Sequence, residues 1–227
     1  MAIRPIVITG DPVLHRPAAR VERFDAALRS LIGDLVETMD AAHGVGLAAP
    51  QIGVGLRIFT YAIPNDDGVL PRGVVVNPIL AVGKIPKERP DPDEESEGCL
   101  SVPGQSFPLK RAGWVKVSGF GAAGEPLEFE ATGWFARCIQ HEFDHLNGKL
   151  YVDRLTDRWA RKARKAARSR GWGKPGLSWR PGVDPDPFGH DHEVGDHDFA
   201  AHGPDAHVEG GPAPATEYAT DEVSDPA

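Results

Sequence analysis

Apolar residues between positions 24 and 43 recur at steps of three and four, which is the spacing of one helix face. They are Phe24, Leu28, Leu31, Ile32, Leu35, Val36 and Met39. Asp25 is placed to cap the start of this helix, and Gly44 is placed to end it. Similar spacing predicts two further helices, one over residues 134–146 and one over residues 156–170.

Four short segments are rich in β-branched and apolar residues, which favours strands. They cover residues 56–63, 73–80, 114–120 and 127–132. The last two flank a turn-forming sequence at 121–124, so we expect them to pair as a hairpin. The stretch 86–97 is rich in Pro and acidic residues, and we interpret it as a surface loop.

Large apolar residues become rare beyond residue 172, where Gly, Pro, Asp, His and Ala dominate. A segment of this composition buries too little apolar surface to offset the entropy lost on ordering. We therefore expect one folded domain, residues 1–172, followed by a disordered tail, residues 173–227. Removal of this tail is expected to leave the domain and its chemistry unchanged.

The charge is divided along the chain. The formal net charge is -8, but no Lys or Arg follows Arg180, so an acidic tail joins a mildly basic body. No segment approaches the roughly 18–20 apolar residues of a membrane-spanning helix, and the N-terminus lacks the features of a signal peptide. The two cysteines do not form a disulfide framework. A cytoplasmic protein that binds neither membranes nor DNA is expected.

The clearest candidate chemistry is the sequence HEFDH at residues 141–145, inside the predicted helix 134–146. His141 and His145 lie one turn apart on one face, so both imidazoles can reach a single metal ion. Glu142 beside them can act as a base toward water. An exposed helix with these residues by chance is the alternative, but the apolar neighbours Trp134 and Ile139 favour the metal site.

A catalytic metal site needs a third protein ligand and an open position. Downstream of the predicted helix, the nearest histidine is His190, which falls in the expected tail. Upstream, Cys99 lies in the sequence EGCLS and is an attractive thiolate ligand. A lone cysteine is more often a small buried apolar residue, so this segment alone is only moderately specific.

The Gly-rich stretch 44–53 has two interpretations. It spells the GxGxxA pattern of a dinucleotide site, but a helix rather than a strand precedes it, and Pro50 interrupts the helix that such a site would open. The favoured interpretation is a backbone segment held close to a substrate, with Gln51 offering an amide N–H.

In order and wording, GVGLAAPQ, EGCLS and QHEFDH resemble the three motifs of the peptide deformylases. These enzymes remove the formyl group from the N-terminal formylmethionine of nascent polypeptides and release formate. The resemblance covers about residues 4–170. It implies an α+β fold, with antiparallel β-sheets around a central helix that carries the HExxH motif.

The resemblance also implies the roles of individual residues. The metal ligands are expected to be Cys99, His141 and His145, and the catalytic group Glu142. The donors to the developing oxyanion are expected to be Gln51 and the backbone N–H of Leu100. Val45, Gly46, Trp134 and Cys138 are the candidates for the pocket of the methionine side chain. The resemblance implies Fe(II) as the metal ion, although Zn, Ni or Co also suit this ligand set.

Two other functions remain open on the sequence. A zinc endopeptidase would share the HExxH helix, although it usually takes its third ligand downstream. A structural zinc module could use Cys138, which lies on the same helix face as both histidines, as a fourth ligand beside Cys99. The basic helix 156–170 resembles the ribosome-contacting element of some deformylases, so a ribosome contact is a further hypothesis.

Overall fold

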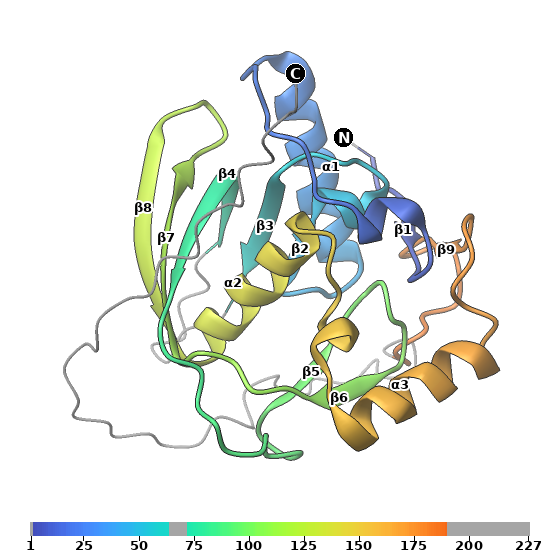
Figure 1. The fold of residues 1–227 in the computed structure, drawn as a ribbon. Helices are drawn as coiled ribbons and strands as arrows, with labels where there is room; N and C mark the ends of the chain where they lie inside the picture. The colour runs from blue at the N-terminus through green and yellow to red at the C-terminus, as the bar shows by residue number, and fades with distance from the viewer. Residues whose placement is uncertain (1, 64–71, 190–227) are drawn as a thin grey trace, which may run out of the picture.

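The computed structural model describes residues 2–63 and 72–189 (Figure 1). Its largest unit is a five-stranded antiparallel sheet in the order β2-β3-β4-β7-β8. The strands are β2 (Gly46–Ala48), β3 (Ile58–Ala62), β4 (Arg72–Val82), β7 (Trp114–Phe120) and β8 (Pro126–Thr132). Two small antiparallel sheets pair β1 (Ile6–Val7) with β9 (Ser178–Trp179) and β5 (Ser96–Gly98) with β6 (Ser106–Pro108).

Three α-helices and three short 3-10 helices complete the described part of the fold. They are α1 (Ala26–Ala41), α2 (Gly133–Leu146), α3 (Asp157–Ser169), η1 (Pro12–His15), η2 (Ala49–Ile52) and η3 (Tyr151–Arg154). Figure 1 shows α2 at the centre of the molecule, between the large sheet and the β5–β6 pair. Within residues 2–63 and 72–189, no helix has the length and hydropathy needed to cross a bilayer.

The strands nearest to α2 are buried on both faces. Successive residues of β3 face opposite sides of the sheet, so Ile58 packs in one apolar cluster with Leu35 and Met39 of α1. Phe59 points the other way and packs with Ile139 of α2. The sheet is therefore covered by α1 on one side and by α2 on the other. This arrangement confirms the predicted α+β fold with a central helix that carries the HExxH motif.

The predicted elements agree with the structure to within two residues at each end. The helix expected over 24–43 is α1, and Asp25 caps it by accepting a hydrogen bond from the Leu28 backbone N–H at 3.0 Å. The shortest strands, β1, β2, β5, β6 and β9, were not predicted. Segments of two or three residues show no periodicity, and their pairing depends on backbone hydrogen bonds rather than on side-chain type.

The expected boundary between the folded domain and the tail, after residue 172, lies too early in the chain. Trp179 of β9 pairs with Ile6 of β1 and is only 7% exposed. The backbone N–H of Gly173 donates to the Thr9 carbonyl at 3.1 Å. A single large aromatic side chain buries enough surface to anchor a segment that is otherwise poor in apolar residues. The rest of the expected tail, residues 190–227, lies outside the described residues.

The C-terminal end of α2 is held by Arg57, which is half-buried just before β3. Its guanidinium Nη1 donates to the Leu146 carbonyl at 3.1 Å and to Asn147 Oδ1 at 3.0 Å. The guanidinium carbon also lies 5.4 Å from the centre of the Phe143 ring. A positive charge at this end of a helix is favourable because the last carbonyls point toward it. Arg57 thereby fixes the end of the helix next to His145.

We expect Arg57→Met to lower the free energy of unfolding by about 1–2 kcal/mol, because the last turn of α2 loses both a charge and two hydrogen bonds. Urea denaturation followed by tryptophan fluorescence measures this loss. Arg29→Met is the matched control, because Arg29 is exposed on α1, and we expect it to change stability by less than about 0.5 kcal/mol. Equal losses in the two variants would contradict the capping role.

Candidate metal centre and active site

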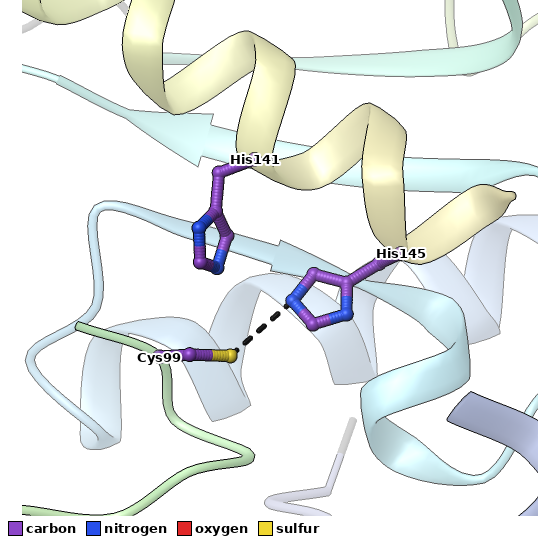
Figure 2. A group of neighbouring side chains, drawn as sticks. All are labelled: Cys99, His141 and His145. Atoms are coloured by element: carbon purple, nitrogen blue, oxygen red, sulfur yellow. Dashed lines mark hydrogen bonds between the residues drawn. The ribbon is translucent and has the colours of Figure 1, made fainter. Parts of the chain in front are cut away.

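Three side chains from two elements converge beside α2 (Figure 2). The ligand atoms of Cys99, His141 and His145 all lie within 4.8 Å of one another. The Cys99 Sγ is 3.4 Å from His145 Nε2, and the two imidazole centroids are 5.0 Å apart. Both histidines come from one face of α2, while Cys99 follows directly after β5. The sequence-predicted ligands are therefore brought together.

This group fits a single divalent metal ion. One thiolate and two imidazoles suit Fe(II) or Zn, and three protein ligands leave a position free for a reacting molecule. Beside them, Glu142 is only 4% exposed, and its Oε2 has no hydrogen-bond partner among the described residues. A buried carboxylate oxygen without a partner is costly unless a ligand or water occupies the adjacent space.

Cys138 does not join this group among the described residues. Burial, together with the negative charge of Glu142 and Glu97, raises the pKa of the Cys138 thiol. A thiol that keeps its proton is a poor metal ligand. Cys138 lies outside the converging group, so the closed four-ligand site of a structural zinc module is not formed among the described residues, and Cys138 lines a neighbouring pocket instead.

A pocket of about 230 Å³ opens onto the three converging side chains. It is lined by every sequence-predicted site residue except His145, which is completely buried behind it. These lining residues are Val45, Gly46, Gln51, Cys99, Leu100, Trp134, Cys138, His141 and Glu142. Seven other residues of the wall were not among the predicted site residues, namely Ala42, His43, Gly44, Glu97, Gly98, Arg137 and Phe188.

Gln51 is 1% exposed and lies in η2, directly after β2. Its Oε1 accepts a hydrogen bond from the Ala48 backbone N–H at 2.8 Å, which fixes the plane of the side-chain amide. Its Nε2 then points toward the Cys99 Sγ at 3.7 Å. The Gln51 amide N–H is thus directed toward the converging side chains.

Gly46 of β2 lies directly against Glu142. A Cβ atom at this position would be 2.4 Å from Glu142 Oε1, so any larger residue would displace the carboxylate. Burial raises the pKa of Glu142 to about 7, despite the opposing effect of His141. The carboxyl group is therefore placed, and poised near neutrality, to exchange a proton.

Glu97 connects His141 to two arginines. Its Oε2 lies 3.1 Å from His141 Nδ1, and its carboxylate accepts hydrogen bonds from Arg111 Nε at 2.8 Å and Nη2 at 2.9 Å. Arg137 Nη1 donates to the same carboxylate at 2.9 Å. Burial alone would raise the pKa of Glu97, but the Arg111 and His141 hydrogen bonds and charges outweigh it and hold the pKa well below its usual value.

An ionised Glu97 determines which nitrogen of His141 is available. The carboxylate accepts a hydrogen bond from the Nδ1–H of His141, which leaves Nε2 for the metal side. The same ion-pair chain continues through Arg111, whose Nη1 lies 2.6 Å from Asp144 Oδ2, and Asp144 also pairs with Arg154. Arg137, His141 and Asp144 share one face of α2, so charged residues beside His141 are visible in the sequence, but the sequence does not indicate which of them contacts Glu97.

Sequence comparisons with known proteins show similarity to peptide deformylases. A sequence model of the polypeptide deformylase family matches residues 3–161. A peptide deformylase of Mycolicibacterium paratuberculosis is 57% identical over 197 residues, which cover 84% of this chain and 100% of that protein. A peptide deformylase of Mycobacterium marinum is 56% identical with the same coverage.

Solved structures show the same similarity. The peptide deformylase of Legionella pneumophila is 41% identical, with a TM-score of 0.64, and the match covers 75% of this chain and 96% of that one. The peptide deformylase of Synechococcus elongatus, solved in complex with actinonin, is 40% identical, with a TM-score of 0.61 and coverages of 74% and 87%.

We expect Glu97→Gln to lower the free energy of unfolding by about 3 kcal/mol, because two buried guanidinium groups lose their shared carboxylate. Urea denaturation of the variant and of the unmodified protein measures the difference. Glu94→Gln is the control, because it removes an exposed carboxylate, and it should leave the free energy of unfolding nearly unchanged. A small loss for Glu97→Gln, similar to that of the control, would show that the ion-pair chain contributes little.

Proposed function

The chain belongs to the polypeptide deformylase family, and from this we propose that it uses one divalent metal ion to hydrolyse the N-formyl group of formylmethionyl nascent polypeptides. The observation that carries the metal dependence is the convergence of Cys99, His141 and His145 beside the buried carboxylate of Glu142. Family membership also argues against the alternative of a zinc endopeptidase. Because nascent chains are the substrate, we propose a cytoplasmic location.

Cys99, His141 and His145 would hold the metal ion, which when bound supplies a Lewis acid that makes hydroxide available near neutral pH. The Glu97 carboxylate keeps the His141 ring in the orientation this requires, through the contact at Nδ1. His145 is completely buried, so its ring is held by packing within the core. These contacts leave one side of the Cys99, His141 and His145 group facing the pocket.

Glu142 is the proposed proton carrier. The water oxygen attacks the formyl carbon, and Glu142 accepts the proton that this oxygen loses. When the C–N bond breaks, formate leaves and Glu142 returns the proton to the released amine. Its Oε2, which has no partner among the described residues, and its raised pKa both suit this exchange at neutral pH.

Two donors are proposed for the negative charge that develops on the formyl oxygen. One is the Gln51 side-chain amide, whose orientation is fixed by the Ala48 backbone N–H. The other is the backbone N–H of Leu100, which directly follows Cys99. Loss of one such donor typically lowers the rate by a factor of ~10²–10³.

The methionine side chain is proposed to enter the pocket beside Val45, Gly46, Trp134 and Cys138. Arg137 also lines this pocket, but its Nη1 is occupied by Glu97 and by the Leu109 carbonyl at 2.7 Å. Arg137 can therefore contact an apolar substrate side chain through its aliphatic stem. A charged side chain in this position would be buried without a partner, which favours methionine.

We expect Glu142→Gln to retain the metal but to lose formate release from formyl-Met-Ala by at least ~10²-fold, because the proton carrier is gone. Cys99→Ala should instead reduce the bound metal, since a ligand is removed. Metal content by elemental analysis and formate release by a coupled assay separate the two effects. Loss of metal from a folded Glu142→Gln variant, or normal turnover by it, would contradict the assigned role.

We propose Fe(II) as the physiological ion, with Zn, Ni or Co as possible substitutes. The ligand set suits these ions, and oxidation of iron or of the Cys99 thiolate would inactivate the enzyme. Protein purified without oxygen should therefore lose activity in air, while protein loaded with nickel should remain active. Residual formate release after timed exposure to air measures this. Equal loss from both forms would remove the argument for iron.

Helix α3 is the proposed ribosome contact. Its basic residues are Arg158, Arg161, Lys162, Arg164, Lys165 and Arg168, and Arg170 follows the helix. No residue of α3 is fully buried. Trp159 attaches the helix to the domain by packing against Phe107, with ring centroids 6.2 Å apart, so the charged face is left to solvent.

We expect binding to ribosomes to weaken steeply with salt, because phosphate contacts release counterions. Replacement of the exposed Arg161, Lys165 and Arg168 by Gln should reduce the slope of log affinity against log salt concentration by about three. Cosedimentation at several salt concentrations measures the slope. Turnover of formyl-Met-Ala by the same variant is the control and should stay unchanged, and an unaltered slope would exclude α3 as the contact.

A further inference from the structure

The chain beyond α3 returns to the loop that carries Cys99. We call residues 172–189 the C-terminal strap. Its strand β9 pairs with β1, and the Ile8 backbone N–H donates to the Leu177 carbonyl at 2.9 Å. A Cβ atom at Gly10 would lie 2.4 Å from the Gly173 backbone, so the two segments touch closely. The strap is therefore anchored along its first half by backbone contacts.

Trp179 links the strap to the active-site loop. Its indole Nε1 donates a hydrogen bond to the Leu100 carbonyl at 3.0 Å, and the residue is 7% exposed. Leu100 is the residue whose N–H is the proposed second donor to the formyl oxygen. Because this N–H and this carbonyl flank the same Cα, a bond that holds the carbonyl also restrains the direction of the N–H.

The far end of the strap reaches the pocket. Phe188 is half-buried, its ring centroid lies 5.8 Å from that of Trp179, and it lines the pocket together with Leu100 and Gly44. The preceding Pro187 carbonyl lies beside Gly104, because a Cβ atom at Gly104 would be 3.0 Å from the Pro187 oxygen. The strap thus places one aromatic side chain in the wall of the substrate pocket.

We propose that two residues of the C-terminal strap, Trp179 and Phe188, belong to the substrate site. Phe188 contributes to binding by contacting the apolar surface of the bound formyl peptide, and Trp179 is a positioning residue that acts through Leu100. The inference rests on the proposed deformylase function. It concerns residues outside 3–161, the part of the chain that the family model matches. A strap with only a structural role would affect stability and leave the kinetic constants unchanged.

Steady-state formate release from formyl-Met-Ala tests the role of Phe188. Phe188→Ala should raise KM about ten-fold and leave kcat within two-fold, because an apolar contact made equally in ground and transition states is lost. Phe188→Leu should give a smaller rise, and it serves as the test variant if Phe188→Ala does not fold. Val183→Ala is the control, since Val183 lies in the same strap but is 70% exposed.

Trp179→Phe tests the link to Leu100. Phenylalanine keeps an aromatic ring against Phe188, but it removes the N–H donor together with part of the buried apolar surface of the indole, so the thermal midpoint should fall somewhat. We expect kcat to fall about ten-fold at unchanged KM, because one hydrogen bond that orients the oxyanion donor is lost. Metal content is measured in every variant, so that loss of the ion is not mistaken for loss of positioning.

The proposal is overturned if KM for the Phe188 variants equals that of Val183→Ala, or if kcat of Trp179→Phe equals that of the unmodified enzyme. Lower thermal midpoints with unchanged kinetic constants would assign the strap a structural role only. Failure of the proposed function has a different signature, because the unmodified, metal-loaded enzyme would then release no formate from formyl-Met-Ala.

Discussion

The rest of the site depends on one buried carboxylate, Glu97. It lies in β5 two residues before Cys99, and it binds Arg111, Arg137 and the Nδ1 of His141. At 3% side-chain exposure, this charge would be strongly destabilising without its partners. The strand that leads to the thiolate and the helix that carries both histidines must therefore meet in the arrangement that pairs Glu97. The three ligand atoms converge as a consequence of that pairing.

Around this pairing, the fold leaves α2 little freedom to move. The large sheet packs against one side of the helix through residues such as Phe59, and Arg57 holds its C-terminal end. On the pocket side, Gly46 lies so close to Glu142 that no larger residue fits without displacing the carboxylate. Rigid placement of this kind is what a hydrolytic site requires, because its donors and its base must already be oriented when the substrate arrives.

The substrate side is built differently from the metal side. The proposed ligands come from α2 and from the end of β5, whereas the pocket wall is assembled from segments far apart in the chain, among them residues 42–46, α2 and the C-terminal strap. The strap reaches this wall through one indole hydrogen bond and one aromatic ring, so its contribution depends on very few side chains. The metal side and the pocket wall therefore come from different parts of the chain. The chain can keep the metal site of its family while part of its pocket wall is formed by residues outside 3–161, the range that the family model matches.

The helices and the longer strands could be predicted from the sequence, because each is encoded locally. The convergence of Cys99 with His141 and His145 was expected from the resemblance to a family rather than from local pattern. The spacing of His141 and His145 follows from the helical repeat, and the apolar periodicity of α1 follows from its one buried face. The partners of Glu97 could not be predicted, since nothing near it in the sequence indicates which arginines will meet it. Nor could Trp179 and Phe188, which lie in a segment whose overall composition is typical of a tail. Trp179 contacts Leu100, which lies 79 positions earlier, and pairs with Ile6 near the start of the chain, and only tertiary packing brings such residues together.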